Sequence, residues 1–215
     1  MPVPLVQLAL DFPTVEQALQ AAEIGVRAGV DILEAGTPLI VAQGVTAIGR
    51  LAKAFPHMPV LADYKTMDSG FRNVQLTKEQ GGHYMTVCAN SPDETVQSAI
   101  RQGKESSIQV VADTIGVKNQ AARSRQCAEW GVDMIYLHFG ADQRRAAPDR
   151  DTVPWIEEVQ AAVDIPIGVA TFDVADGVAA ARKGVYLLAI GHPVVGTDEA
   201  AFDRLRRYVE AVKSV

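Results

Sequence analysis

The feature that most constrains the fold of this chain is a regular alternation of short apolar runs with longer amphipathic segments. The amphipathic segments have helical periodicity, and the first of them opens with Thr14 and Gln17 at the spacing of a capping box. The apolar runs have the length of buried strands, and eight are expected: Leu5–Leu10, Ile32–Glu34, Val60–Asp63, Tyr84–Val87, Ile108–Asp113, Met134–His138, Ile165–Ala170 and Tyr186–Ile190. Strict alternation of strands and helices predicts a parallel sheet.

Eight such pairs in 215 residues predict an α/β fold of the (β/α)8, or TIM, barrel type, with residues 1–215 forming a single domain. A doubly wound open sheet is the alternative. Such a sheet usually carries a glycine-rich phosphate-binding turn after its first strand, and this chain reads LDFPT there. We therefore expect a closed barrel of eight strands, each followed by one helix.

Composition narrows the range of partners. With 48% hydrophobic and 21% charged residues, the chain is typical of soluble globular proteins. A net charge of −6 without a cluster of Lys and Arg argues against nucleic acid as a partner. No apolar run reaches the roughly 20 residues of a membrane span, and the N-terminus lacks the features of a signal peptide. We therefore expect a cytoplasmic protein with no membrane partner.

Ionisable residues occur where the expected strands end. In barrels of this type the chemistry gathers at the carboxyl ends of the strands. One such residue would be explained better as a helix cap or a loop ion pair, but five of the eight ends carry one, and five at a single rim predict a site. The residues, called the strand-end cluster below, are Asp11, Glu34, Asp63, Lys65, Asp113 and His138.

The charges of this cluster predict a cation. Four carboxylates with one lysine would repel one another, and oxygen ligands without paired His or Cys favour Mg²⁺. Glu34 and Asp63, on adjacent strands, are the expected ligands. Lys65 adds a second positive charge that suits the stabilisation of an enediolate. His138, the one histidine at a strand end, is the expected proton carrier.

The remaining histidines and cysteines are expected to have other roles. His57 and His83 lie away from the active rim and are interpreted as structural, whereas His192 follows the eighth strand and is a candidate for substrate contact. Cys88 lies at the active rim without an evident base, which argues against a nucleophile. With Cys127 it makes neither a disulfide framework nor a zinc motif.

The stretch DYKTMD at Asp63–Asp68 has the Asp-x-Lys-x-x-Asp pattern of the orotidine 5'-phosphate decarboxylase suprafamily. Four longer stretches resemble 3-hexulose-6-phosphate synthase and 3-keto-L-gulonate-6-phosphate decarboxylase within it: LALD at Leu8–Asp11, LEAGTPLI at Leu33–Ile40, AFPHMPVLADYKTMDSG at Ala54–Gly70 and HFGADQ at His138–Gln143. The resemblance runs from the first strand through the sixth, and more weakly to the end.

The resemblance implies a homodimeric (β/α)8 barrel that uses Mg²⁺ to stabilise the enediolate of a sugar phosphate. It also implies roles for individual residues. They are metal binding by Glu34 and Asp63, contact with the enediolate oxygen by Lys65, proton transfer by His138, substrate contact by Asp11, Asp113 and Asp142, and a reach into the neighbouring subunit's site by Asp68.

Three activities of the suprafamily are separated by single positions. The pattern of the orotidine enzyme has Lys at the end of strand two, where this chain has Glu34, so the chain does not resemble that enzyme at this position. The pattern of the gulonate decarboxylase has Glu at the position of Asp113 and Arg at the position of Ala141, and this chain differs from it at both. The synthase pattern His-x-Gly-x-Asp fits HFGAD. We therefore expect an aldol lyase that condenses formaldehyde with ribulose 5-phosphate; a keto sugar acid decarboxylase and a non-catalytic sugar-binding homologue are the alternatives.

The chain departs from the family at the expected phosphate site. The family holds phosphate on backbone N–H groups after strands seven and eight, and reads Gly-Gly after strand seven. Here that position holds Thr171 and Phe172, and after strand eight Gly191 is followed by His192. We expect Phe172 to crowd the phosphate, and Thr171, Gly191 and His192 to contact substrate instead. Whether the substrate carries a phosphate is left open.

Overall fold

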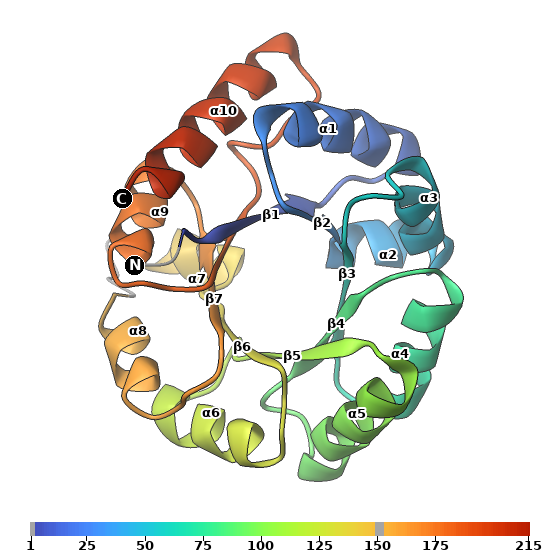
Figure 1. The fold of residues 1–215 in the computed structure, drawn as a ribbon, viewed down its shortest axis with the longest axis vertical. Coiled ribbons are helices and arrows are strands. Elements are labelled where there is room, and N and C mark those ends of the chain that lie inside the picture. Colours follow the sequence, from blue (N-terminus) through green and yellow to red (C-terminus); the bar gives the residue numbers. More distant parts are fainter. Residues whose placement is uncertain (1–2, 149–152) are drawn as a thin grey trace.

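Eight parallel strands form the centre of the computed structural model, which describes residues 3–148 and 153–215 (Figure 1). They pair in chain order, and β8 closes the ring against β1. The strands are β1 Leu5–Leu10, β2 Ile32–Ala35, β3 Val60–Thr66, β4 Tyr84–Cys88, β5 Gln109–Asp113, β6 Met134–Leu137, β7 Ile167–Thr171 and β8 Leu187–Ile190. The predicted barrel is confirmed, with strand ends that differ from the expected ones by up to three residues.

Ten helices, not the expected eight, occur in the described part of the chain: α1 Val15–Ala28, α2 Thr37–Gln43, α3 Thr46–Ala54, α4 Gly70–Glu79, α5 Asp93–Ser106, α6 Gln120–Glu129, α7 Ala141–Ala146, α8 Val153–Gln160, α9 Val174–Ala181 and α10 Glu199–Lys213. The expectation of one helix per strand was therefore wrong after β2 and β6. After β2, Pro38 lies in the first turn of α2 and Gly44 ends it, so that α3 starts as a separate helix. Among the helices described, none is both long and apolar enough to cross a bilayer.

Local sequence sets the bounds of helix α1. The Thr14 hydroxyl accepts a hydrogen bond from the backbone N–H of Gln17 at 3.3 Å, as the capping-box spacing predicted. Gly29 ends the helix at a φ of 91°, in the left-handed region that glycine adopts without strain.

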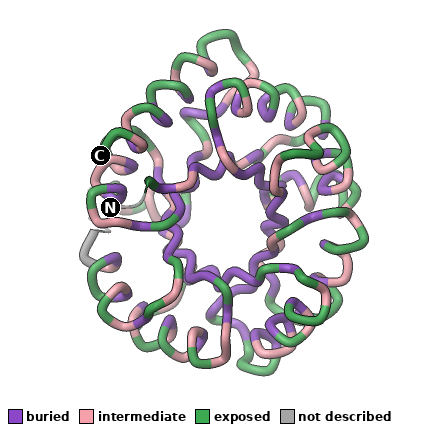
Figure 2. The backbone as a smooth tube through the Cα atoms, in the orientation of Figure 1, coloured by how far each residue is buried: buried purple, intermediate pink, exposed green. Residues whose placement is uncertain are grey.

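The barrel wall is buried on both faces (Figure 2). Its outer face packs against the helices, and its interior holds a smaller apolar cluster that includes Ile32, Leu61, Val111 and Tyr136. Because strand side chains alternate between faces, the residue two positions after each of these also points inward. Those residues are Glu34, Asp63, Asp113 and His138. The period of the strands therefore places the charged side chains together above an apolar floor.

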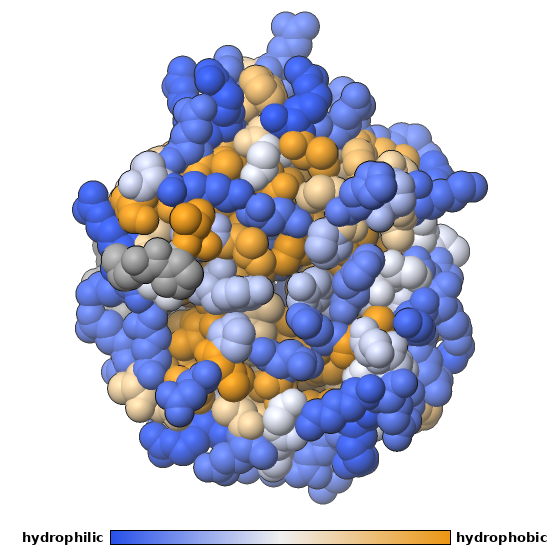
Figure 3. Space-filling view, in the orientation of Figure 1, coloured by the Kyte–Doolittle hydropathy of each residue, from blue (hydrophilic) through white to orange (hydrophobic). Residues whose placement is uncertain are grey.

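The helices turn their polar residues to solvent. Seen along the same axis, the periphery of the molecule is mostly hydrophilic, and hydrophobic residues show between hydrophilic ones nearer the centre (Figure 3). Helix α10 illustrates the reason, since Leu205 and Tyr208 are buried and its exposed residues include Arg206 and Glu210, which pair at 3.5 Å.

Candidate active site

Strand β3 carries Asp63 and Lys65 at the barrel mouth by means of an irregular backbone. The strand continues past the expected end to Thr66, and its register against β4 shifts between Ala62 and Thr66. Lys65 has a φ of 48°, which is unusual for a residue other than glycine. Such a conformation costs about 1–3 kcal/mol and is found where the surroundings hold it in place. Here the backbone N–H of Lys65 donates to the Thr86 hydroxyl at 2.9 Å.

Asp63 has hydrogen-bond donors on both carboxylate oxygens. Oδ1 accepts from the Thr86 hydroxyl at 2.8 Å, and Oδ2 accepts from the Thr37 hydroxyl at 2.9 Å and forms an ion pair with Lys65 Nζ. Burial by itself would raise the pKa of Asp63, but the Lys65 ammonium and these hydrogen bonds hold that pKa below its ordinary value. Asp63 is therefore an anion with fixed orientation.

Asp113 and His138 form a second pair beside the first. Asp113 is fully buried, and its Oδ2 lies 2.8 Å from His138 Nδ1 and 4.0 Å from Lys65 Nζ. Its other oxygen accepts the backbone N–H of Ile115 at 2.8 Å. A carboxylate at Nδ1 orients the imidazole and leaves Nε2 to exchange protons. The structure thus brings Asp63, Lys65, Asp113 and His138 together as expected, while their catalytic roles stay predictions.

Glu34 is a buried carboxyl that has no cation as its direct partner among the contacts described. It is 5% exposed, and its Oε2 accepts from Gln7 Nε2 at 2.5 Å. Burial, followed by the charges of Asp63 and Asp11, raises the pKa of Glu34 well above its ordinary value. Gln7 Oε1 is buried without a hydrogen-bond partner in the part of the chain that is described. Around Glu34, the described residues therefore supply too little positive charge for the carboxylates and no hydrogen-bond donor for Gln7 Oε1.

Asp11 leans against the ends of the strands on either side of β1. A Cβ atom added to Gly36 would lie 2.0 Å from Asp11 Oδ1, and one added to Gly191 would lie 3.8 Å from Oδ2. Only glycine at position 36 allows this approach. Because Gly36 of the EAGTP stretch has no side chain, the Asp11 carboxylate can lie against the end of β2, within the strand-end cluster.

The carboxylates of Glu34 and Asp63 fit a metal ion whose remaining ligands are water and substrate oxygens. Within the ranges described, no group of three or more His, Cys, Asp and Glu side chains forms a metal site by itself. Glu34 and Asp63 do supply two carboxylates on neighbouring strands, close enough for the charge of one to act on the other. Mg²⁺ is commonly held by one or two carboxylates, with waters and substrate oxygens completing its shell.

Some predicted site residues lie outside the cluster. Asp68 is exposed, and its Oδ1 accepts the backbone N–H of Ser69 at 2.7 Å. The Asp142 side chain is 97% exposed and pairs with Arg145 at 3.1 Å. His192 is exposed on the loop that follows β8. Their roles in substrate or partner binding stay predictions.

The expectation that the Thr171 side chain contacts substrate was wrong. Its hydroxyl is buried, donates to the backbone oxygen of Ala189 at 2.8 Å and lies 2.6 Å from the Tyr208 hydroxyl on α10. Thr171 continues the outward-facing row of Ile167 and Val169 in β7, so that it faces the surrounding helices and not the mouth.

Three polar residues of the site were missed by reasoning from the sequence. Thr37 donates to Asp63 and accepts from Lys65 Nζ at 3.0 Å, Thr86 supports both residues, and Gln7 holds Glu34. A signal was present for two of them. Gln7 and Thr86 are polar residues at inward-facing positions of otherwise apolar strands, which is where a side chain that supports a buried carboxylate has to lie.

The cysteines are unsuited to nucleophilic chemistry. Cys88 is 4% exposed, and burial followed by the charge of Asp113 raises the pKa of its thiol to about 12. For Cys127, burial raises the thiol pKa to about 11. Since the thiolate is the reactive form, both are inert at neutral pH. This agrees with the interpretation of Cys88 from the sequence.

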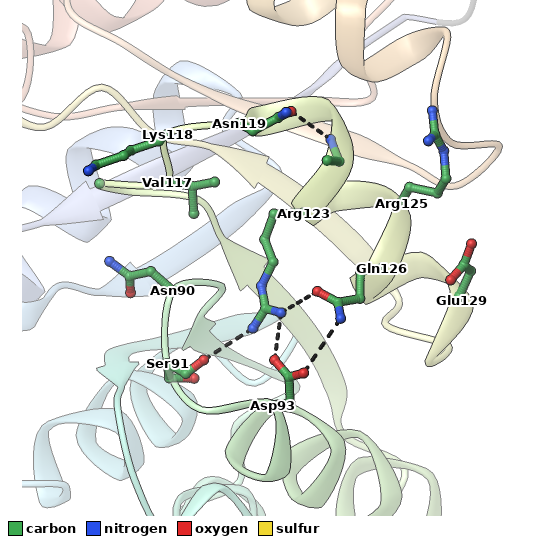
Figure 4. A pocket seen from close by; sticks show the side chains of 12 residues that line it. Asn90, Ser91, Asp93, Val117, Lys118, Asn119, Arg123, Arg125, Gln126 and Glu129 are labelled. Atoms are coloured by element: carbon green, nitrogen blue, oxygen red, sulfur yellow. Dashed lines mark hydrogen bonds and ion pairs between the residues drawn. The ribbon is translucent and has the colours of Figure 1, made fainter.

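A cavity of about 740 Å³ lies apart from the cluster, beside α6 and the loops after β4 and β5. Arg123 of α6 points across it to the start of α5, where it pairs with Asp93 at 2.7 Å and donates to the backbone oxygen of Ser91 at 3.1 Å (Figure 4). None of the residues that line this cavity belongs to the strand-end cluster. Arg123 is already paired with the protein's own groups.

Comparison with known proteins identifies the family to which the chain belongs. The model of the orotidine 5'-phosphate decarboxylase / HUMPS family matches residues 4–196. The 3-hexulose-6-phosphate synthase of Mycobacterium gastri is 31% identical over 201 residues, which cover 82% of this chain and 96% of that protein. The synthase of Bacillus subtilis is 33% identical over 136 residues, which cover 63% of this chain and 64% of that protein, just under two thirds of its length.

A solved structure extends the similarity to the whole fold. The crystal structure of 3-hexulose-6-phosphate synthase from Salmonella typhimurium superposes with a TM-score of 0.89 at 32% sequence identity. The superposition covers 96% of this chain and 97% of that one. The similarity therefore extends over nearly the whole barrel.

Proposed function

Because the chain belongs to the orotidine 5'-phosphate decarboxylase / HUMPS family, we propose that it is a lyase that makes or breaks a carbon–carbon bond beside the enediolate of a sugar phosphate. The relatives at 31% and 32% identity are named 3-hexulose-6-phosphate synthase. The proposed reaction is accordingly the addition of ribulose 5-phosphate to formaldehyde, with Mg²⁺ as the cofactor.

The observation that carries the proposal is the position of Lys65 between two buried carboxylates. Burial alone would lower the pKa of Lys65, but Asp63 and Asp113 raise that pKa above its ordinary value. The side chain is thus a permanent cation and does not act as a base. A fixed ammonium in a partly buried site stabilises negative charge that develops on a substrate oxygen. An enediolate carries such a charge.

His138 supplies the proton chemistry. We assign it the removal of a proton from carbon 1 of ribulose 5-phosphate, which leaves the electron pair in the enediolate. When carbon 1 of the enediolate then adds to the carbonyl carbon of formaldehyde, the carbonyl at carbon 2 forms again, and the oxygen that came from formaldehyde takes the proton from the same imidazole. Asp113 holds the ring through Nδ1 at 2.8 Å and stabilises its charged form between the two transfers.

Glu34 and Asp63 would hold the metal, and bound Mg²⁺ would act as a Lewis acid toward the oxygens of the enediolate. The ion pair of Lys65 with Asp63 supports a role for Lys65 in stabilising the same oxygens. Asp11, whose charge acts on Glu34, would contact a substrate hydroxyl.

The aldol reaction is preferred over decarboxylation because of two positions. Asp113 is short enough to pair directly with His138, and position 141 is alanine where the decarboxylase pattern has arginine. Decarboxylation of a keto sugar acid passes through the same type of enediolate and is the alternative within this chemistry. A non-catalytic sugar-binding protein is the alternative outside it.

Incubation with ribulose 5-phosphate, formaldehyde and Mg²⁺ is expected to consume formaldehyde, and chelation of the metal is expected to stop the reaction until Mg²⁺ is restored. Formaldehyde is measured over time, with heat-denatured protein as control. Turnover of a keto sugar acid without consumption of formaldehyde would replace the aldolase by a decarboxylase. No turnover of either substrate, together with sugar binding, would establish the non-catalytic alternative.

We also propose that the protein is a homodimer in which Asp68 reaches the neighbouring active site. Asp68 lies between Met67, which is 51% exposed, and Phe71, which is 48% exposed. Exposed large apolar side chains around a charged residue suit a subunit interface. Sedimentation velocity at micromolar concentration is expected to show a dimer. A monomer under these conditions would remove Asp68 from the site.

A further inference from the structure

The apolar floor beneath the strand-end cluster contains a tyrosine that the mechanism above does not use. Tyr136 of β6 lies two residues before His138, so both side chains point into the barrel. It is the register partner of Asp113 in β5, and register partners on neighbouring parallel strands point to the same face. The rings of Tyr136 and His138 meet edge to face, with 5.5 Å between their centroids. Tyr136 therefore lies beside both members of the pair to which the proton chemistry is assigned.

A glycine on the next strand gives the Tyr136 ring its room. Gly168 of β7 is the register partner of Tyr136 on that side, and a Cβ atom added to it would lie 2.9 Å from Tyr136 Cδ2. Carbon atoms in contact prefer about 3.5–4.0 Å, so a side chain at position 168 would push the ring away. Tyr136 is only 8% exposed. Packing therefore holds the ring in one orientation inside the barrel.

The hydroxyl of Tyr136 has no protein partner. Among the described residues no hydrogen bond to it occurs, and it is not one of the fully enclosed polar atoms that lack a partner. It therefore faces open space. In the closed ring of eight strands, β6 lies opposite β2, so Tyr136 extends into the barrel from the side opposite Glu34 (Figure 1).

This hydroxyl is a donor that stays neutral. Burial, followed by the charges of four carboxylates, of which Glu34 acts most strongly, raises the pKa of Tyr136 well above its ordinary value. The carboxylates that act on it belong to the strand-end cluster, which places the hydroxyl at the barrel mouth. A buried tyrosine usually finds a partner for its O–H group. We infer that the partner of Tyr136 arrives with the substrate.

The oxygen of the aldehyde is the substrate atom that needs a donor at this point. It becomes an alkoxide as the carbon–carbon bond forms, and it takes its proton from His138, so it has to lie near that ring. Lys65 is assigned to the oxygens of the enediolate. The carboxylates of the site can only accept hydrogen bonds while they are ionised. Beside His138, the Tyr136 hydroxyl is the side-chain group that is able to donate and is not already engaged.

We propose that Tyr136 is a catalytic residue of the addition step, in which its hydroxyl donates a hydrogen bond to the aldehyde oxygen. The electron pair of carbon 1 of the enediolate forms the new bond to the aldehyde carbon, and the carbonyl π pair moves to the oxygen. That oxygen is then protonated by His138, whereas Tyr136 keeps its own proton throughout. The inference rests on the proposed lyase function and adds to it the residue that acts on the electrophile.

The two half-reactions can be measured separately. Removal of the proton from carbon 1 needs no aldehyde, so it is followed by proton NMR as deuterium uptake at carbon 1 of ribulose 5-phosphate in heavy water. The addition is followed as formaldehyde consumption. Both are measured at saturating Mg²⁺ on the unaltered protein, on Tyr136→Phe and on Tyr84→Phe. Tyr84→Phe is the matched control, because Tyr84 packs on the same interior cluster but at the start of β4, away from the mouth.

Tyr136→Phe is expected to lower kcat for formaldehyde addition by about 10²-fold, as for the loss of one donor to an oxyanion. It is expected to leave the rate of deuterium uptake and the KM for ribulose 5-phosphate unchanged, because the ring and the enediolate contacts remain. Tyr84→Phe is expected to leave both rates unchanged. A residue that only supports the structure would not separate the two rates.

Two results with an active unaltered protein would overturn the role of Tyr136: full addition by Tyr136→Phe, or an equal loss of addition and of deuterium uptake. Deuterium uptake without formaldehyde consumption by the unaltered protein would also overturn it, since no aldehyde would then be involved. The failure of the lyase proposal has a different signature. The unaltered protein would then show neither reaction, and the role of Tyr136 would be refuted together with the lyase.

Discussion

Replacement of Lys65 by methionine is expected to lower kcat/KM for the lyase reaction by about 10³-fold or more. A single uncharged donor to a developing oxyanion is worth roughly 10²–10³-fold, and an ammonium contributes more. Lys65 is paired with Asp63 and lies 4.0 Å from Asp113, so its removal leaves both carboxylates without their cation. The assay is formaldehyde consumption at saturating Mg²⁺.

A loss of folding has to be separated from this loss of activity. Breaking a buried ion pair from one side costs about 3–5 kcal/mol of stability. The double variant with Asp63→Asn added removes the unpaired carboxylate, and we expect it to regain stability in urea unfolding without regaining activity. Turnover by a folded Lys65→Met protein within tenfold of the unaltered enzyme would refute the role of Lys65.

Replacement of Glu34 by glutamine is expected to abolish Mg²⁺ binding and to raise the free energy of unfolding of the metal-free protein at neutral pH. The first effect follows from the loss of a charged ligand. The second follows because the pKa of Glu34 is raised in the folded state, so that its ionisation opposes folding. Because one unit of pKa shift corresponds to about 1.4 kcal/mol, the gain is expected to be measurable by urea unfolding. The new amide also offers a donor near Gln7 Oε1.

The stabilisation by Glu34→Gln is expected to depend on pH. Below the ordinary glutamic acid pKa of 4.5, Glu34 is protonated in both the folded and the unfolded state, and glutamine gives no advantage in charge. The advantage grows as the pH rises above that value. Urea unfolding in the presence of a chelator measures it, and Glu23→Gln, on the exposed face of α1, is the control. A Glu34→Gln protein that is less stable at pH 7 and still binds Mg²⁺ would contradict the proposed ligand.

The sequence by itself determined the barrel and most of the strand-end cluster, because both depend on short-range periodicity. Alternation of apolar runs with amphipathic segments fixes the order of strands and helices. A period of two then places Asp63 above Leu61 and Asp113 above Val111 on the same inner face. The same period applied to β7 would have turned Thr171 outward, in line with Val169. That error came from the choice of strand end and not from missing information.

Only the tertiary structure decided which partners complete these side chains, because the partners are far apart in sequence. Thr171 is joined to Tyr208, 37 residues further on, and Asp63 to Thr86, 23 residues further on. Two further features depend on distant segments in the same way. The backbone N–H of Lys65, a residue in the left-handed region, donates to Thr86, and the guanidinium of Arg144 packs on the ring of Phe172. A local pattern encodes the direction of a side chain, whereas hydrogen bonds and ion pairs depend on where the closed barrel brings distant segments together.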